Sequence, residues 1–323
     1  LPPLIVEPWG YRRRARLSVK HVPKKGKTLV GFRERDPRFV ADLSRCEVLD
    51  PALGEKLDVL GVLLNSLEGA AAIPQIEFSA GDDARALVFR HLQPLSHTDR
   101  EKLISFGREH GFAIFLQPSG TDSVHALYPE TIRLHYRLGE FDLDLEFAPL
   151  DFVQVNGRLN ARMIAQALSL LDPQPHERVL DLFCGLGNFS LPIARRAAFV
   201  CGLEGEAGLV ARARGNAVRN GIANVEFMVG DLAADARGAA WTRQSFDKWL
   251  LDPPRTGAAA LLEQTPGKSV RRVMYVSCHP GSLARDADTL VHRHGFGLAA
   301  AGVMDMFPHT AHVESIAVFD RKL

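Results

Sequence analysis

The pattern that most restricts the fold begins after Asp151, where short apolar segments alternate with glycine-bearing turns and helical segments. The predicted strands are Arg178–Phe183, Phe199–Glu204, Val225–Val229, Lys248–Leu251 and Arg272–Ser277. A helix follows each of the first two strands, and these helices end near Arg196 and Asn220. Strands and helices that alternate in this way form a doubly wound parallel sheet, with ligands at the carboxyl ends of the strands. We therefore expect an α/β, Rossmann-like domain over residues 150–323. The alternation ends with two strands that only a loop joins, Leu298–Met306 and Val313–Phe319.

Residues 1–149 follow a different pattern. Alternating segments such as Ala15–Val19, Thr28–Phe32 and Ala86–Arg90 predict strands of a half-exposed sheet, and helical segments near 53–68 and 97–111 interrupt them. We expect an α+β domain here, ahead of the Rossmann-like domain.

Basic residues crowd the start of this α+β domain, although the net charge of the chain is only +1. Within the first forty positions, around Tyr11 and Phe32, stand Arg12, Arg13, Arg14, Arg16, Lys20, Lys24, Lys25, Lys27, Arg33, Arg35 and Arg38. Phosphates favour such a patch, so RNA is a candidate partner. On charge alone, the solvated face of a sheet explains the patch equally well.

The bulk composition predicts an ordinary globular protein. With 323 residues, 46% of them hydrophobic and 24% charged, the chain can bury a core in each of about two domains. No apolar run approaches the roughly 20 residues that cross a bilayer, so no membrane location is expected. The cysteines, which lack a Cys-x-x-Cys pair, fit a reducing cytoplasm. We expect a cytoplasmic monomer, and because the chain opens on Leu1 we expect that further residues precede it.

A strand that runs into a glycine turn, Val179–Asn188, is the first candidate ligand site. Gly185 and Gly187 allow the backbone to approach a ligand closely, and Glu204 stands where a carboxylate can accept hydrogen bonds from ribose hydroxyls. A third glycine, which a dinucleotide site needs, is missing near Ser190. The turn therefore favours a nucleotide of another kind.

Acidic residues around this turn favour a cationic ligand. Asp181 would repel a pyrophosphate but suits S-adenosylmethionine, which carries an amine and a sulfonium. Asp231, which follows the strand Val225–Val229, stands where a side chain can meet an adenine amino group. Helix capping explains Asn188 or Asp231 taken alone, but their joint placement at strand ends favours methyl-donor binding.

Two later strand ends carry reactive groups. Leu250-Leu-Asp-Pro-Pro-Arg255 places a carboxylate and a stiff turn after a strand. Amino-group methyltransferases often have an aromatic residue after the two prolines, where this chain has Arg255. Val276-Ser-Cys-His-Pro280 places the thiol of Cys278 at another strand end, where exposure and a lowered pKa are feasible.

His279 and Arg285 are close enough in sequence to support a thiolate at Cys278. The alternative for a free cysteine is a small buried apolar residue, as we expect for Cys184 and Cys201.

The last loop and strand bring His309, Thr310, His312 and Glu314 close together in the sequence. Two histidines and a glutamate could ligate a metal. Because no further ligand set is evident, we favour a general base over a metal site.

The motifs together resemble those of the RNA 5-methyluridine methyltransferases, most closely the ribosomal-RNA branch, from Gly10 through nearly the whole chain. They are Phe152-Val-Gln-Val-Asn156, Asp181-Leu-Phe-Cys-Gly-Leu-Gly-Asn-Phe189, Leu251-Asp-Pro-Pro-Arg255, Val276-Ser-Cys-His-Pro280 and Met306-Phe-Pro-His-Thr-Ala-His-Val-Glu-Ser315. The resemblance implies methylation of uridine carbon 5 in RNA, with 23S ribosomal RNA as the expected partner.

The resemblance also assigns roles to individual residues. Cys278 would be the nucleophile that adds to uracil C6, and Glu314 the base that removes the C5 proton. Arg16 and Phe152 would lie close to the target uracil, which must leave the RNA stack. The positions that would hold S-adenosylmethionine are Gln154, Phe183, Asn188, Glu204, Asp231 and Asp252.

The ribosomal branch normally begins with a TRAM domain, which this sequence lacks, and then a cysteine cluster that holds a 4Fe–4S cluster. Cys46, in Ser44-Arg-Cys-Glu-Val-Leu49, resembles the last ligand of that cluster, and the other three are missing from this sequence. We expect an iron–sulfur cluster only if upstream cysteines exist, because such clusters normally take four ligands.

Other functions remain open at this stage. A tRNA uridine C5 methyltransferase would share the catalytic motifs. An amino-group methyltransferase would use the turn at Asp252 without Cys278, and an RNA-binding module without catalysis would need the basic patch but no methyl donor. A redox or iron–sulfur protein would make Cys46 central, but the missing ligands argue against it.

Overall fold

The computed structural model describes residues 1–232, 240–263 and 266–322, and it divides into two compact units. Glu7–Tyr136 and Glu146–Gly157 form one, the platform unit. Leu1–Val6, Arg137–Leu145 and Arg158–Leu323 form the other, the parallel-sheet unit. The boundary expected between residues 149 and 150 falls inside the platform unit.

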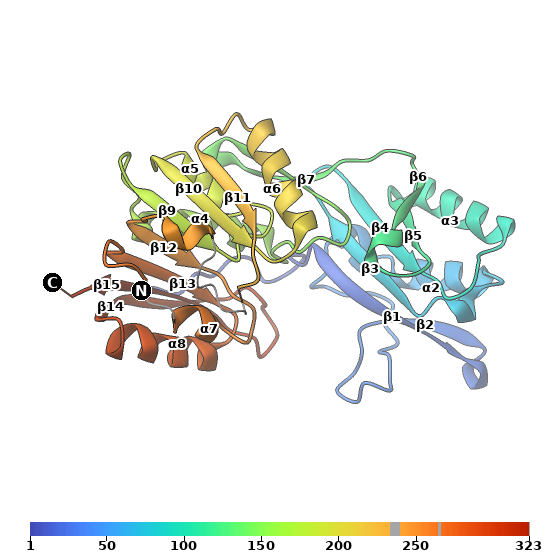
Figure 1. Cartoon of the computed structure of the whole chain (residues 1–323). Helices are drawn as coiled ribbons and strands as arrows, with labels where there is room; N and C mark the ends of the chain where they lie inside the picture. The colour runs from blue at the N-terminus through green and yellow to red at the C-terminus, as the bar shows by residue number, and fades with distance from the viewer. Residues whose placement is uncertain (233–239, 264–265, 323) are drawn as a thin grey trace. The chain divides into compact units, whose positions relative to one another are not determined.

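The platform unit is an α+β structure around a six-stranded sheet, with the strand order β2-β1-β3-β4-β5-β6 (Figure 1). Only β4 and β5 pair in parallel. The strands are β1 (Arg14–Val22), β2 (Lys27–Gly31), β3 (Gln75–Ala80), β4 (Arg85–Arg90), β5 (Ala113–Gln117) and β6 (His125–Tyr128). The helices are α1 (Pro51–Gly54), α2 (Leu57–Ser66) and α3 (His97–His110), with 3-10 turns at Pro23–Lys25, Ala70–Ala72 and Thr121–Ser123.

Strand β1 shows how the sequence builds this unit. Its side chains alternate, so Ala15 and Leu17 are buried while Arg16 and Lys20 are exposed. The buried face packs in one core with apolar residues of α2, of which Leu60 is fully buried. The sheet therefore has one apolar face and leaves basic side chains of β1 on the other.

The parallel-sheet unit contains a seven-stranded sheet with the order β11-β10-β9-β12-β13-β15-β14 (Figure 1). The first five of these strands are parallel, and β15 pairs antiparallel with both β13 and β14. The strands are β9 (Arg178–Leu182), β10 (Phe199–Glu204), β11 (Val225–Val229), β12 (Lys248–Leu251), β13 (Arg272–Ser277), β14 (Phe296–Met304) and β15 (Glu314–Arg321). The predicted α/β, Rossmann-like architecture is confirmed.

Helices pack on this sheet as the alternating pattern requires. Helix α6 contacts β10 and β11, and α8 contacts β13, β14 and β15 (Figure 1). The helices are α4 (Gly157–Leu171), α5 (Ser190–Ala194), α6 (Ala207–Arg219), α7 (Ala259–Leu262) and α8 (Pro280–His292), with 3-10 turns at Gly139–Phe141 and Ala240–Arg243. In the described part of the chain, no helix has the length and apolar character that would let it span a membrane.

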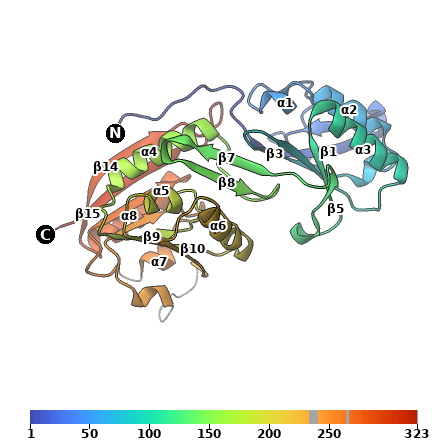
Figure 2. The same cartoon turned by 90° about the horizontal axis from the view of Figure 1, so that it is seen from above.

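A separate pair of strands, β7 (Leu134–Leu138) and β8 (Leu143–Phe147), forms a two-stranded sheet (Figure 2). The division between the two units falls within these strands. Strand β14 spans Phe296–Met304, two residues earlier than the predicted Leu298–Met306. The register explains the shift, because Met304 pairs with Glu314 and residues beyond Met304 have left the sheet.

Candidate active site

The turn after β9 has the backbone that its glycines predict. Gly185 and Gly187 have φ angles of 55° and 96°, in the left-handed region that glycine adopts without strain. Phe183 also has a positive φ, 67°, which is unfavourable for a bulky residue. Strain of this kind persists only where the surrounding structure enforces it, and it is concentrated at ligand sites.

Three side chains fix the shape of this turn. Glu204, at the end of β10, accepts a hydrogen bond from the Gly185 N–H at 3.1 Å. Asn188 and Asn160 of α4 exchange two amide hydrogen bonds of 2.9 and 3.0 Å. Helix α5 begins two residues later, at Ser190, and its N-cap residue is Phe189. The two bonds to Asn160 hold the Asn188 side chain in the turn.

Asp181 is the buried acid beneath the turn. Its Oδ2 accepts a 2.5 Å hydrogen bond from Ser190, whereas its Oδ1 is buried without a hydrogen-bond partner. Burial, together with the charges of Asp252 and Glu204, raises the pKa of Asp181 to about 7. Burial raises the pKa of Asp252 to about 7 as well. A cation bound here would favour both ionised forms.

The loop that carries Asp252 leaves β12 beside the turn after β9 (residues 183–188), which is called the cofactor turn below. The Asp252 N–H donates to the Leu182 carbonyl at 3.2 Å. The far end of this loop is held by Asp286 of α8. The Asp286 carboxylate accepts from the Ala258 N–H at 2.7 Å and from the Tyr275 hydroxyl at 2.5 Å. One buried acid thus ties the Asp252 loop to β13 and α8.

Cys278 follows β13 directly, in the turn that opens α8. The side chain is half-buried, and burial raises the pKa of its thiol, as do the charges of Glu314 and Asp252. The lowered pKa considered from the sequence is therefore wrong for this structure. The thiol lies among carboxyl groups, which disfavour a thiolate.

The two basic residues expected to support the thiolate have other partners. The His279 ring accepts a 3.1 Å hydrogen bond from the Ser282 N–H and so caps α8. Arg285 donates to Asp286 at 2.8 and 2.9 Å and to the carbonyl of Thr256. Both side chains are therefore engaged at the start of α8 and the Asp252 loop, and their support of a thiolate stays a prediction.

Glu314 begins β15, and the register of β15 on β13 places it near Cys278. Ser277 pairs with Ser315, so Cys278 and Glu314 are the next residues along each strand. Glu314 is only 6% exposed, and burial together with the charge of Asp252 raises its pKa to about 8. Cys278, Asp252 and Glu314 therefore form one electrostatically coupled group at the end of the sheet.

The loop before Glu314 is open to solvent. His309, Thr310 and His312 are exposed, and His312 packs its ring 5.4 Å from that of Phe307. Among the residues described, no three histidine, cysteine or acidic side chains gather as metal ligands do.

Asp231 follows β11 and is exposed. It stands beyond the carboxyl end of that strand, as Glu204 ends β10 and Asp252 follows β12. The fold therefore places these acidic residues at the same edge of the parallel sheet.

Three predicted residues belong to the platform unit. Arg16 makes a 2.6 Å ion pair with Glu77 and keeps 68% of its side chain exposed. Phe152 is exposed and Gln154 is half-buried, both on the segment after β8. Arg14 donates to the carbonyls of Leu150 and Asp151, and so fastens this segment to β1.

The arginines at the start of β1 differ in their exposure and in their partners. Arg14 is used within the unit, and Arg13 lies 3.6 Å from Asp82 and stacks 5.8 Å from the Tyr136 ring centre. Only Arg16 among these three is largely exposed. Further along the predicted patch, Lys20, Lys24, Arg33, Arg35 and Arg38 are exposed. Phosphate binding by the patch stays a prediction.

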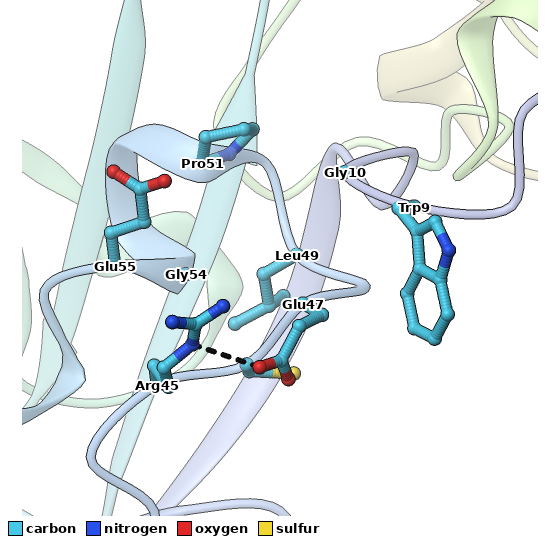
Figure 3. A pocket seen from close by; sticks show the side chains of 9 residues that line it. Trp9, Gly10, Arg45, Glu47, Leu49, Pro51, Gly54 and Glu55 are labelled. Atoms are coloured by element: carbon cyan, nitrogen blue, oxygen red, sulfur yellow. Dashed lines mark ion pairs between the residues drawn. The ribbon is translucent and has the colours of Figure 1, made fainter.

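Cys46 lines a pocket of about 430 Å³ in the platform unit (Figure 3). Arg45 and Glu47 form a 2.8 Å ion pair on the pocket wall, and the Trp9 ring stands across from them (Figure 3). Of the other cysteines, Cys184 and Cys201 are buried in the parallel-sheet unit. Cys46 is thus the single cysteine among the residues that line this pocket.

A sequence model of the family described as tRNA (Uracil-5-)-methyltransferase matches residues 130–322. The chain belongs to this family. Its similar relatives include the 23S rRNA (uracil(1939)-C(5))-methyltransferase RlmD of Xanthomonas oryzae pv. oryzae (strain MAFF 311018), with 62% identity over 100% of this chain and 72% of the relative. The protein of the same name from Xylella fastidiosa (strain 9a5c) is 62% identical over 99% of this chain and 72% of its own.

A solved structure of similar fold is the Pyrococcus abyssi tRNA (uracil-54, C5)-methyltransferase in complex with S-adenosyl-L-homocysteine. It superposes with a TM-score of 0.73 at 21% identity, over 97% of this chain and 76% of that chain. At this identity the match supports the fold.

Sequence reasoning missed Asn160 and Asp286, which position other residues of the site. Asn160 orients Asn188, and Asp286 anchors the Asp252 loop. The spacing of apolar residues in α4 could have revealed the helix on which Asn160 lies, but no sequence signal indicated its partner. Asp286 reads in the sequence as an ordinary acidic residue of a helix. Its role appears only in the structure, where it accepts hydrogen bonds from Tyr275 and Ala258.

Proposed function

We propose that this member of the tRNA (uracil-5-)-methyltransferase family transfers a methyl group from S-adenosylmethionine to carbon 5 of a uridine in 23S ribosomal RNA. The observation that carries the proposal is the group of Cys278, Asp252 and Glu314 at adjoining strand ends, beside the cofactor turn. An amino-group methyltransferase needs no thiol at this point.

The residues of the turn fit a cationic nucleoside. Asp181 has a buried oxygen without a partner, and burial raises the pKa of both Asp181 and Asp252. Glu204 ends β10, where it can accept from ribose hydroxyls as well as from the turn backbone. Phe183, Asn188 and Asp231 would line the same site, and Gln154 is the further residue that we propose as a contact of the methyl donor. When bound, the donor supplies an electrophilic methyl group.

Cys278 would begin the reaction by losing its proton to water and adding its sulfur to uracil C6. The electron pair of the C5–C6 double bond moves toward the C4 carbonyl, which makes carbon 5 nucleophilic enough to take the methyl group, while the electron pair of the broken methyl–sulfur bond stays with the donor sulfur. Glu314 would then accept the proton from C5, the C5–C6 double bond re-forms, and the carbon–sulfur bond breaks to release the thiolate. The raised pKa of Glu314 makes its carboxylate a stronger base than an exposed glutamate.

The platform unit would bind the RNA. Arg16 and Phe152 are both exposed there and would contact the target uracil after it leaves the RNA stack. Ribosomal RNA is favoured over tRNA by the 62% identity to enzymes named for 23S rRNA. We propose this unit as the RNA-binding domain and the parallel-sheet unit as the methyltransferase domain.

Iron–sulfur binding does not fit the residues of this chain alone. A 4Fe–4S cluster takes four thiolates, and Cys46 offers one at its pocket. We propose Cys46 as a ligand only together with cysteines from outside this sequence, and no catalytic step depends on it.

The test incubates the protein with S-adenosylmethionine labelled in its methyl group and with transcribed 23S rRNA. A second reaction contains tRNA in place of 23S rRNA. Nucleoside analysis should find the label in 5-methyluridine from 23S rRNA, and Cys278→Ala should remove it while donor binding persists. Label on an exocyclic amine would refute uracil C5 methylation. Label in tRNA but not in 23S rRNA would replace the proposed substrate.

A further inference from the structure

The exposed face of β1 continues well past Arg16. Because side chains alternate along a strand, Arg16, Ser18 and Lys20 lie on the same face. Arg33 joins them from the segment after β2, where its Nε donates to the Ser18 hydroxyl at 3.1 Å. Arg16 and Lys20 are about 13 Å apart at the usual rise of a strand. Arg16, Lys20 and Arg33 therefore form a basic strip on this face. The strip begins at Arg16, which we propose as a contact of the target uracil.

Phe39 stands at the far end of this strip and is 52% exposed. Lys20 Nζ lies 5.8 Å from its ring centre, and the Arg38 guanidinium carbon lies 5.9 Å from it. Lys20 also donates to the Arg38 carbonyl at 2.6 Å, which links β1 to the segment that carries the ring. An isolated exposed apolar residue is ordinary, but an exposed aromatic ring beside two cations is the combination that nucleic-acid stacking sites use.

The segment that carries Phe39 is fixed by its own hydrogen bonds. The Phe39 N–H donates to the Asp36 carbonyl at 3.0 Å, and the Phe39 carbonyl accepts from the Glu34 N–H at 3.1 Å. Asp36 also pairs with the Arg38 guanidinium at 2.6 Å. The ring is thus presented on an ordered turn, so little conformational freedom remains to be lost when a base stacks on it.

We propose that Phe39 is a stacking platform for an unpaired base of the RNA substrate, distinct from the target uracil, with Lys20 and Arg33 contacting the phosphates beside it. This inference rests on the proposed function and adds to it the path of the RNA strand, from Arg16 along β1 to Phe39. RNA is the occupant because it is the substrate class of the proposed function, and it combines flat bases for the ring with a continuous negative charge for the basic strip.

The test measures the affinity of the full chain for a fluorescently labelled single-stranded RNA, by anisotropy at several salt concentrations and without methyl donor. Phe39→Ala should weaken binding by about 5- to 150-fold, the usual loss for one stacked base. The salt slope should stay unchanged because no phosphate contact is removed. Lys20→Ala should instead flatten the slope of log affinity against log salt by about 0.7. Leu92→Ala, at an apolar residue of the same unit that is 59% exposed, is the matched control and should bind as the unmodified chain does.

Phe39→Trp provides the second arm, because it keeps an aromatic face. It should restore the affinity, and RNA should quench its added indole fluorescence relative to the unmodified chain. Equal affinity of Phe39→Ala and Leu92→Ala, or no restoration by Phe39→Trp, would overturn the platform. The assay needs no methyl transfer, so a chain that binds RNA through Phe39 but forms no 5-methyluridine would contradict the proposed function and leave this inference standing.

Discussion

Replacing Glu314 with glutamine should change how the stability of the protein depends on pH. Burial and the charge of Asp252 raise the pKa of Glu314 from 4.5 to about 8 in the folded chain. A folded-state pKa above the unfolded value means that the protonated side chain favours folding below pH 4.5. That contribution is lost as the pH rises through 8. Glutamine does not titrate, so Glu314→Gln should be spared this loss.

The size of the effect follows from the same pKa values. Each unit between the two pKa values corresponds to about 1.4 kcal/mol, so the full rise gives at most about 5 kcal/mol. The free energy of unfolding of Glu314→Gln, minus that of the unmodified chain, should therefore grow with pH between about 5 and 8 and then level off.

Urea denaturation at half-unit steps from pH 5 to pH 9 measures this difference. Glu109→Gln, whose parent side chain is 75% exposed on α3, shows what the loss of one carboxylate does without burial. A difference for Glu314→Gln that is constant with pH, or that shrinks as the pH rises, would refute the account of Glu314 as a desolvated carboxyl.

The remaining predictions concern the cofactor turn, its support and the uracil site. Glu204→Ala should weaken donor binding by about 1–3 kcal/mol in calorimetry, because a charge-assisted hydrogen bond to ribose would be lost, and unchanged affinity would place the ribose elsewhere. Asp286→Ala should lower the free energy of unfolding by about 2–5 kcal/mol in urea titrations, because it leaves the Tyr275 hydroxyl and the Ala258 N–H without their acceptor. A loss below about 1 kcal/mol would show that the Asp252 loop is held by other contacts. Arg16→Ala should reduce the single-turnover methylation rate more than RNA affinity, and the reverse would make Arg16 a phosphate contact.

The sequence predicted four of the five parallel strands to the residue, and the fifth, β9, ends at Leu182, one residue before the predicted end. The bounds expected for β10, β11, β12 and β13 are those observed. These strands are apolar runs that polar, glycine or proline residues interrupt at their ends, so local composition defines them. Strand β14 was displaced by two residues because its end depends on pairing with β15, which the local sequence does not encode.

The chemistry of the site was harder to predict because it depends on neighbours distant in the sequence. The motif around Cys278 showed a thiol at a strand end, and the raised pKa became visible only once Glu314 and Asp252 were placed beside it. The cluster of basic residues in the sequence likewise did not reveal that Arg14 donates to the carbonyl of Leu150, more than 130 positions away. Motifs predicted which groups take part, and folding determined their protonation and partners.

The measurement that tests the central claim most directly is the mass of the complex trapped by Glu314→Gln with 23S rRNA and S-adenosylmethionine. If Cys278 adds to C6 and Glu314 removes the C5 proton, methyl transfer occurs once and elimination stalls. A denaturation-resistant adduct should then accumulate on the peptide that contains Cys278. Its mass should equal protein plus RNA fragment plus one methyl group, less the hydrogen that the thiol loses. Glu109→Gln should turn over without such an adduct, and Cys278→Ala should give neither adduct nor methylation. Normal turnover of Glu314→Gln without an adduct, or methylation by Cys278→Ala, would contradict the account.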